Sequence, residues 1–337
     1  MSSSRLKDTE TAERALAAGD RIREAKAEIA RAIVGHVDLV EQMLVCLLCR
    51  GHALIEGVPG LGKTFLIKSL GEVLDLATTR IQFTPDLMPA DIIGTNVLIR
   101  DQEGEQVIRF QKGPIFSHVL LADEINRATP KTQSALLEAM QEQGVTVAGR
   151  TIGLAPPFIV LATQNPIEME GTYPLPEAQL DRFFFKLRVA YPEYDDLLSI
   201  VDRTTGGAPP SLRRVLTAAE IIEFQDLIRS VPASRPVMDY AVRLVYATHP
   251  GRPDSSDEVK RYVRYGSSPR GAQGLVLAGK VYALLDRRFA VSFEDIRRAA
   301  LPALRHRLIL SFQGEAEGAD PDEVIARVVD ATPEGGA

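Results

Sequence analysis

The sequence predicts an α/β fold in which a core with a parallel five-stranded sheet and a phosphate loop is followed by an all-α domain. Three observations predict it. A G-x-x-x-x-G-K-[ST] motif at residues 57–64 lies between a strand-like apolar run and a helix-like one. A second apolar run, at residues 119–124, ends in two acids. After residue 191 the apolar residues repeat at helical spacing.

The phosphate-loop motif is matched at every fixed position. Residues 52–55 before it are typical of a short buried strand, and residues 65–70 open a helix. The glycines let consecutive backbone N–H groups turn toward a phosphate, and the helix adds the positive end of its dipole. In this interpretation Lys63 reaches the β- and γ-phosphates, and the Thr64 hydroxyl ligates Mg²⁺. The alternative is a glycine-rich surface turn, but the flanking strand and helix favour the phosphate site.

Composition limits the class of protein. The 337 residues are enough for about two domains, and 45% hydrophobic with 25% charged residues is ordinary for a soluble globular chain. No apolar run approaches the roughly 18 residues that a membrane span needs. Residues 1–20 are polar and lack the apolar segment of a secretion signal, so we expect a cytoplasmic protein. The net charge of −6 disfavours nucleic acid as a partner.

The two cysteines, Cys46 and Cys49, have the C-x-x-C spacing of some redox and zinc sites. Apolar residues surround them at helical spacing, and no second pair of zinc ligands follows at a suitable distance. We therefore expect both thiols to lie in or beside an apolar helix face as small hydrophobic groups.

The N-terminal region predicts two helices. Residues 10–33 form a charged helical pattern that breaks at Val34 and Gly35, and a second apolar helix then runs to the strand before the phosphate loop. The break lies where a chain could wrap an adenine. An ordinary turn between helices explains it equally well.

Two hairpins interrupt the core pattern. Residues 80–83 are a candidate second strand, after which Pro85 and Pro89 exclude a long helix. Short strand-like runs then flank polar turns at residues 97–110 and again at residues 145–152. Each hairpin is a candidate interaction surface, or else a cover for an edge of the sheet.

Polar residues end two of the buried strands. Asp123 and Glu124 follow the apolar run 119–122, and Asn165 follows the run 158–163. At the carboxyl end of a parallel sheet Asp123 would hold the water shell of Mg²⁺, and Glu124 would act as general base. Asn165 would orient the attacking water, although it is also a good turn residue before a proline. Acids after a strand are common helix N-caps, but the upstream loop favours the catalytic interpretation.

The last predicted strand, residues 183–187, follows a short helix that ends at Arg182. Asp181 and Arg182 would therefore occupy an exposed corner. A solvated salt bridge is the usual arrangement of such a pair. An arginine finger for a neighbouring subunit is the alternative.

Four helical patterns then follow, at residues 218–229, 237–249, 269–287 and 293–304.

With these motifs in order, the chain resembles an AAA+ ATPase of the MoxR family. DEINRA at residues 123–128 and KTQSALLEAM at 131–140 are similar to the family's second acidic motif and its helix. ATQNP at 162–166 resembles sensor 1, and GTYPLPEAQLDRF at 171–183 resembles the finger region. GSSPRG at 266–271 resembles sensor 2, and the likeness runs from about residue 34 to residue 311.

The resemblance implies a hexameric ring with ATP and Mg²⁺ between subunits. Arg182 would act in trans, Arg270 would contact the γ-phosphate in cis from a lid domain, and the hairpins would be the family's inserts. The role of Arg127 stays open. The predicted catalytic residues are Lys63, Glu124, Asn165, Arg182 and Arg270. The predicted nucleotide-binding residues are Val34, Gly35, Gly57, Val58, Pro59, Gly60, Leu61, Gly62, Lys63, Thr64, Phe65, Asp123 and Arg270, with Thr64 and Asp123 on the metal.

The expected organisation is a polar tail at residues 1–20, an α/β core at 21–190, a helical lid at 191–311 and an acidic, glycine-rich tail at 312–337. By resemblance the protein would be a chaperone-like remodeller that acts with a von Willebrand factor A domain protein on a client, for example in metal-cofactor maturation. The alternatives are a nucleic-acid motor of the related helicase type and a nucleotide-gated scaffold without hydrolysis.

Overall fold

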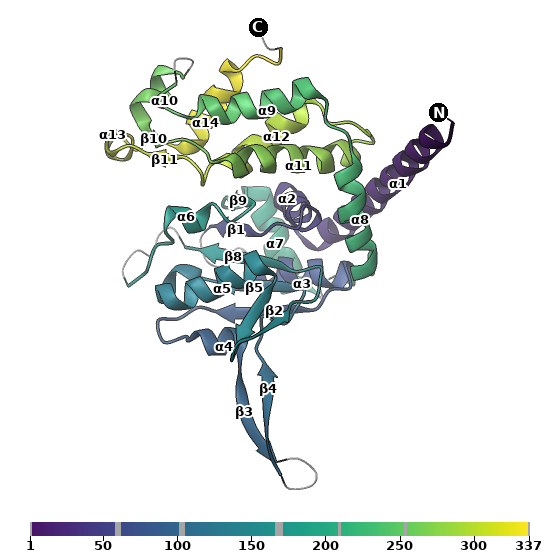
Figure 1. Cartoon of the computed structure of the whole chain (residues 1–337), viewed down its shortest axis with the longest axis vertical. Coiled ribbons are helices and arrows are strands. Elements are labelled where there is room, and N and C mark those ends of the chain that lie inside the picture. The colour runs from purple at the N-terminus through teal and green to yellow at the C-terminus, as the bar shows by residue number, and fades with distance from the viewer. Residues whose placement is uncertain are drawn as a thin grey trace.

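The structure is a computed structural model that describes residues 2–57, 62–100, 105–165, 171–207, 210–252 and 255–335, with side chains from residue 9 onward. A sheet flanked by helices forms the middle of the molecule, a helical domain lies on one side of it, and a long hairpin extends on the opposite side (Figure 1). No described helix has both the length and the apolar composition needed to cross a membrane.

The central sheet is parallel and has the order β2-β5-β8-β1-β9. Its side chains alternate between two hydrophobic clusters, so both faces are buried: Leu121 and Leu161 belong to one cluster, and Leu120 and Val160 to the other. This explains the continuous apolar runs in the sequence and confirms the predicted five-stranded parallel sheet. The strands are β1 Ala53–Glu56, β2 Thr78–Gln82, β5 Val119–Asp123, β8 Ile159–Gln164 and β9 Phe185–Arg188.

The two faces of the sheet carry different helices. The cluster that contains Leu120 also contains residues of α4 Pro89–Ile93 and α5 Pro130–Glu142. The cluster on the other face continues without a break from the sheet into the helical domain, because α1, α2 and α3 all contribute to it. Their bounds are Ser2–Ala32, Val37–Leu48 and Lys63–Val73.

The segment 1–20 was predicted as a polar tail, and this is wrong for the described part of it. Helix α1 begins at Ser2 and contacts α3, α8 and α11. Its buried residues include Ala15, Ala18, Ile22, Ala25 and Ile29, which alternate between spacings of three and four. Alanines make such a narrow stripe easy to miss in a charged segment, because each methyl group adds little apolar surface to the helix.

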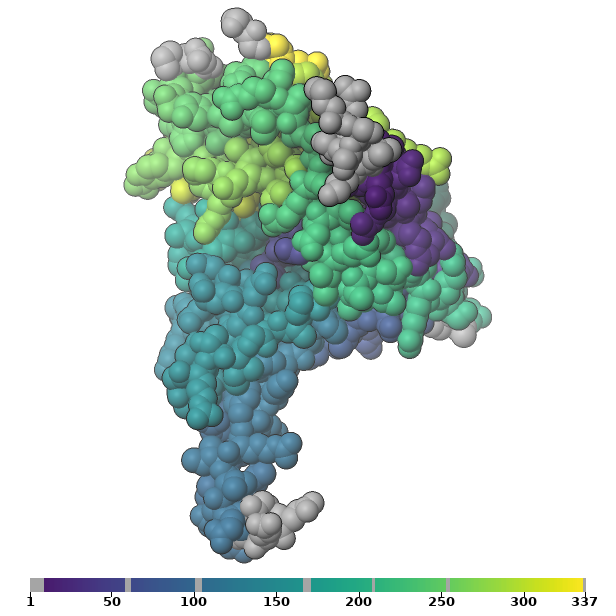
Figure 2. Space-filling view, turned by 45° about the vertical axis from the view of Figure 1, so that its right-hand side comes forward, coloured from purple at the N-terminus to yellow at the C-terminus, as the bar shows by residue number. Residues whose placement is uncertain are grey.

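The first predicted hairpin is present and projects from the body. Strands β3 Gly94–Arg100 and β4 Gln106–Lys112 pair only with each other in the described chain. Figure 2 shows this arm standing clear of the rest of the surface. Leu98 and Ile108, which face each other across the hairpin, are 62% and 73% exposed. The arm is therefore not a cover for the sheet edge. The second hairpin joins β6 Gly144–Val147 to β7 Arg150–Gly153.

The helical domain follows α7, and each of its four predicted helices is present. Polar N-caps start many of them; Ser292, for example, accepts from the backbone N–H of Asp295. A two-stranded antiparallel ribbon of β10 and β11 is an addition to the predicted all-α arrangement. The elements are α7 Tyr194–Gly206, α8 Ala218–Ser230, α9 Arg235–Ala247, α10 Asp257–Tyr262, β10 Val263–Tyr265, α11 Pro269–Leu285, α12 Phe293–Leu304, β11 Ile309–Leu310, α13 Phe312–Ala316 and α14 Pro321–Ala331.

The predicted end of the helical domain at residue 311 is too early. Helix α14 contacts both α9 and α12, and its Val324, Ile325 and Val328 are buried. The acidic composition around it hid this apolar face, since the three residues share one side of the helix. The segment 312–335 is thus part of the helical domain rather than a tail.

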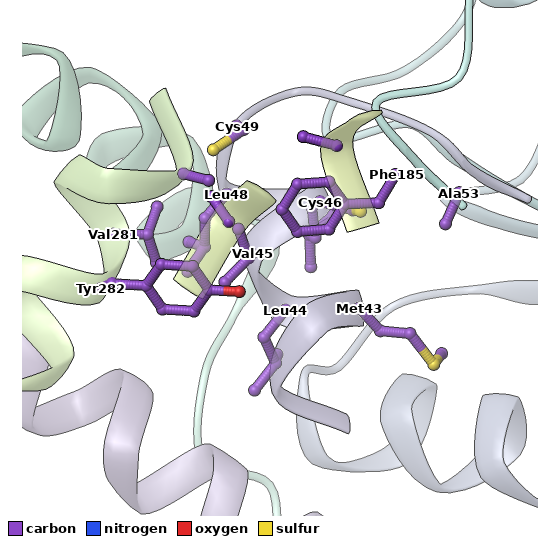
Figure 3. Close-up of a cluster of buried hydrophobic side chains, with 14 of the residues drawn as sticks. Met43, Leu44, Val45, Cys46, Leu48, Cys49, Ala53, Phe185, Val281 and Tyr282 are labelled. Atoms are coloured by element: carbon purple, nitrogen blue, oxygen red, sulfur yellow. The ribbon is translucent and has the colours of Figure 1, made fainter. Parts of the chain in front are cut away.

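The cysteines lie as predicted. Cys46 and Cys49 are free and buried, and Figure 3 shows them among apolar side chains, with Cys46 beside Phe185. Burial raises the pKa of both thiols well above the usual range. Both therefore stay protonated in this environment and behave as small hydrophobic groups.

His52 joins three elements of the core and makes folding sensitive to pH. Its Nδ1 accepts from the Val160 N–H at 2.9 Å, so Nε2 carries the proton and donates to the Met140 carbonyl at 3.1 Å. Burial lowers the pKa of His52 from 6.5 to about 4. Between these values the unfolded chain takes up a proton that the folded chain does not.

We therefore expect the free energy of unfolding to fall as the pH drops from about 6.5 to about 4, with His52 contributing up to about 3 kcal/mol of the loss. Urea unfolding of the wild type and of His52→Gln between pH 7.5 and pH 4 measures this. The variant should show a shallower pH dependence. Parallel curves for the two proteins would contradict the assignment.

Candidate functional site

The polar residues predicted as a site lie at one edge of the sheet. Strand β8 lies between β1 and β5, so the residues that follow these three strands are neighbours. The register pairs Glu56 with Gln164, and the Gly57 N–H donates to the Gln164 carbonyl at 3.3 Å. Parallel pairing therefore brings the start of the phosphate loop, the acids and Asn165 to the same end of the sheet.

The phosphate-loop motif connects β1 to α3, as its chemistry requires. Val58, Pro59, Gly60 and Leu61 lie outside the described residues. Gly62 has a φ of 71° directly before α3, and a Cβ there would meet no atom within 4 Å. Glycine is therefore favoured at this position by backbone conformation and not by lack of space. Thr64 and the exposed Phe65 follow on the first turn of α3.

Lys63 points back toward the loop. Its Nζ donates to the Gly57 carbonyl at 2.6 Å, which holds the ammonium group beside the end of β1. Burial lowers the pKa of Lys63, while the charges of Asp123 and Glu124 oppose that shift. A partly desolvated cation beside two carboxylates is suited to binding a polyphosphate and its metal ion. A threonine hydroxyl and a carboxylate, such as those of Thr64 and Asp123, are oxygen donors of the kind that fits Mg²⁺.

Asp123 is fixed by two partners. Its Oδ1 accepts from Thr163 Oγ1 at 2.6 Å, and its Oδ2 accepts from Arg80 at 2.7 Å. The side chain of Asp123 is 18% exposed. A carboxylate has about four acceptor positions, and Arg80 Nε also donates to Oδ2 at 3.1 Å, so one position is left for a water molecule of a metal ion.

Glu124 has a strained backbone and a constrained side chain. Its φ of 56° lies in the left-handed region, and its N–H donates to Thr163 Oγ1 at 2.8 Å. Its Oε2 accepts from Gln82 at 2.7 Å and from Arg127 at 2.9 Å. The threonine hydroxyl thus bonds to both acids at once, and the turn it stabilises sets the direction of the Glu124 side chain.

Asn165 directly follows β8 and is 7% exposed. The strand that it follows, β8, lies between β1, which leads to Gly57, and β5, which ends at Asp123, so Asn165 lies at the edge of the sheet that carries the other site residues.

Gln133 of α5 connects the acidic turn to the segment before the finger. Its Nε2 lies 3.2 Å from the Ile125 carbonyl, 3.1 Å from that of Ala128 and 2.8 Å from that of Tyr173. Gln133 is 1% exposed, so these bonds are shielded from water. They hold the 3₁₀ turn Ile125–Arg127 against the segment that leads to α6 Glu177–Leu180.

Arg182 and Asp181 do not form the solvated pair predicted for an exposed corner. Arg182 is exposed, and within the described chain its guanidinium has no hydrogen bond or ion pair. Asp181 instead accepts from Ser268 at 2.7 Å and from Arg270 at 3.2 Å, both at the start of α11. Asp181 therefore has its partners in the helical domain and not in its neighbour Arg182. Arg270 is therefore held by Asp181 in this structure.

The predicted adenine turn lies between α1 and α2 and packs against α7. A Cβ on Gly35 would lie 2.6 Å from the Asp196 carboxylate. Val34 is partly buried, and burial lowers the pKa of the adjacent His36. The turn thus has a close neighbour in the segment that leads from the sheet to the helical domain.

Several residues of the site were missed in the sequence. Arg80 and Gln82 lie on β2, two residues apart and so on one face, and they bond to the acids of the adjacent strand β5. Thr163 sits two residues before Asn165 within the sensor-like motif. Two polar side chains in the predicted second strand were a usable signal for Arg80 and Gln82. For Thr163 the usable signal was the sensor-like motif itself.

The comparisons agree with this arrangement. Residues 52–185 match the ATPase family associated with various cellular activities (AAA), and residues 256–328 match the AAA lid domain. The fold and its polar edge are therefore those of an AAA+ ATPase with a C-terminal lid.

Proteins similar to this chain show to which family of AAA+ ATPases it belongs. The chain is 43% identical to Chaperone MoxR1 of Mycobacterium tuberculosis over 90% of this chain and 79% of that one. It is 31% identical to Protein MoxR of Paracoccus denitrificans over 86% and 89%. A crystal structure from Cytophaga hutchinsonii, described as a candidate ATPase, is 38% identical, with a TM-score of 0.89 over 98% of both chains. The chain belongs to the MoxR family of AAA+ ATPases.

The double role of Thr163 can be tested by stability. Thr163→Val keeps the shape but removes the partner of the Glu124 N–H and the donor to Asp123 Oδ1, while Arg80 still donates to Oδ2. We expect the free energy of unfolding to fall by about 1–3 kcal/mol. Thr79→Val, on the partly exposed strand β2, is the matched control and should change it by less than about 0.5 kcal/mol. Equal stability of Thr163→Val and wild type in urea unfolding would show that the hydroxyl bonds are not needed.

Proposed function

We propose that the protein is a cytoplasmic, Mg²⁺-dependent ATPase that works as a ring-forming, chaperone-like remodeller. The observation that carries the proposal is the joint placement of Lys63, Asp123 and Glu124 at one edge of the sheet, with Thr163 bonded to both acids. Membership of the MoxR family and the likeness to a protein named as a chaperone support it.

In this proposal each side chain has a distinct task. Lys63 binds the β- and γ-phosphates of ATP, for which it exchanges its bond to the Gly57 carbonyl. Thr64 and Asp123 hold Mg²⁺, which would neutralise charge on the phosphates. Glu124 removes a proton from the attacking water, and Asn165 orients that water. Gln82 and Arg127 both donate to Oε2 of the Glu124 carboxylate, so Oε1 is the oxygen that would accept the proton.

The site would be completed by a second copy of the chain. Arg182 is exposed, and in the described chain its guanidinium has no partner, which supports a role in trans on the nucleotide of the next subunit. Arg270 lies at the start of a lid helix and would reach the γ-phosphate in cis after leaving Asp181. A site shared head to tail between subunits is compatible with a closed ring, for which we propose a hexamer.

The projecting hairpin of β3 and β4 supports a role in contacting another protein. Its exposed Leu98 and Ile108 form an apolar patch on an arm that, in the described chain, pairs with no other strand. We propose a von Willebrand factor A domain protein as partner and a client protein as substrate, in maturation or metal-cofactor insertion. No observation favours a nucleic-acid motor, and the net charge of −6 disfavours one.

Hydrolysis is tested by single substitutions. Lys63→Ala and Glu124→Gln should each lower kcat for ATP about 10²-fold or more, because each removes a group that acts in the transition state. Glu138→Gln and Lys68→Ala, on exposed faces of α5 and α3, are matched controls that should retain wild-type turnover. Wild-type phosphate release by Glu124→Gln would remove Glu124 from the mechanism.

Sharing of the site is tested by mixing subunits. Arg182→Ala and Lys63→Ala proteins should each be nearly inactive alone. In mixed rings an intact phosphate loop from the first can meet an intact Arg182 from the second, so part of the activity should return. Phosphate release is measured across a series of mixing ratios. No recovery at any ratio, with mixed rings confirmed by mass, would argue against a finger in trans.

A further inference from the structure

A buried arginine of the helical domain holds the backbone on both sides of the finger. Arg307 follows α12, and its side chain is 3% exposed. Its Nε donates to Asp181 Oδ1 at 2.9 Å, and one terminal nitrogen lies 3.3 Å from the Asp181 carbonyl and 2.7 Å from the Phe183 carbonyl. The other terminal nitrogen donates to the Phe184 carbonyl at 3.2 Å. Arg307 thus contacts the residue before Arg182 and the two after it.

His306 reinforces the same contact. Its Nε2 lies 3.0 Å from the Phe183 carbonyl and must carry the proton, because a carbonyl can only accept. Phe183 therefore has two donors on one oxygen, and its side chain is fully buried. Its neighbour Arg182 is exposed. The finger is an exposed side chain on a backbone that the helical domain fixes.

The same carboxylate also contacts the residue proposed to sense nucleotide. Asp181 accepts from Arg307 on Oδ1 and from Arg270 on Oδ2, while Ser268 donates to Oδ1. Burial lowers the pKa of Arg307 to about 10, so it stays charged at neutral pH. A buried ion pair with several backbone bonds has a defined geometry, since leaving either charge unpaired is costly.

We propose that Arg307 and Asp181 are positioning residues for Arg182, and that they make the finger of one subunit depend on the position of that subunit's own helical domain. The inference rests on the proposed role of Arg182 in trans. When Arg270 leaves Asp181 for a γ-phosphate, Asp181 loses one partner and keeps Arg307. Nucleotide in one subunit would thereby alter the finger offered to the next.

The test compares Arg307→Lys with Arg305→Lys. Both residues follow α12, but Arg305 donates to the Lys186 carbonyl and to Asp322, and not to residues 181–184. Arg307→Lys keeps the positive charge but loses the planar guanidinium group with its several N–H donors. We expect kcat to fall about tenfold or more, because a small misplacement of a catalytic group has a large effect. The KM for ATP should stay within about twofold, since the subunit's own site is intact. Arg305→Lys should keep wild-type kcat.

Mixing identifies where the defect lies. Arg307→Lys rings mixed with Lys63→Ala subunits should regain activity, because the second protein supplies a well-placed Arg182. Asp181→Asn, which keeps the side-chain shape, should behave in the same way if Arg307→Lys proves too unstable. A defect that mixing does not rescue, in either variant, would place the damage in the subunit's own site and overturn the inference.

The mixing experiments distinguish failure of the proposed role of Arg182 in trans from failure of the positioning role of Arg307. If Arg182→Ala with Lys63→Ala shows no recovery, the finger in trans is wrong. If that pair recovers and the Arg307→Lys pair does not, only the positioning role is wrong. Trypsin cleavage after Arg182 gives a readout without turnover, and it should be faster in Arg307→Lys than in Arg305→Lys. Equal cleavage rates would also count against the inference.

Discussion

The parallel register of β5, β8 and β1 is the constraint on which the site depends. Because both faces of this sheet are buried, a shift of one residue would exchange the two hydrophobic clusters, so the register is strongly specified. Polar residues that end the strands then have to meet at one edge. Thr163 converts that proximity into fixed geometry, since its hydroxyl accepts from one acidic residue and donates to the next. The packing of the core thus determines where the polar residues of the site lie.

Much of this could be predicted because the information is local. Apolar runs predicted four of the core strands, and the mixed run at residues 80–83 predicted the fifth, β2. The order of the phosphate loop, Asp123, Glu124 and Asn165 predicted which strand ends would carry the site. The family follows from the same motifs. What the sequence did not reveal is mostly non-local: Asp181 meets Arg307 across 126 positions. No pattern near Asp181 indicates this pair, so the residue was wrongly expected to be solvated. A helix at residues 10–33 was predicted, but the burial of Ala15 and Ala18 and of the apolar face of α14 was not, because the composition around them is polar.

The helical domain and the sheet share one continuous hydrophobic cluster through α1, α2 and α3. Two parts separated by a water-filled gap could instead rotate about a hinge. Here relative motion has to occur by small sliding of packed side chains, which is the shear type of domain movement. Bonds such as those from Arg307 to backbone carbonyls tolerate such displacements poorly, because hydrogen bonds weaken within fractions of an ångström and with angle.

The arm of β3 and β4 has a mechanical consequence. Seven residues per strand at about 3.4 Å each give a length of about 24 Å, so a tilt of about 10° at its base moves its far end by about 4 Å. The base adjoins α4, which packs on α5, the helix that carries Gln133. A tilt at the base of the arm that is too small to disturb the core therefore moves the outer end of the arm by about the size of a side chain.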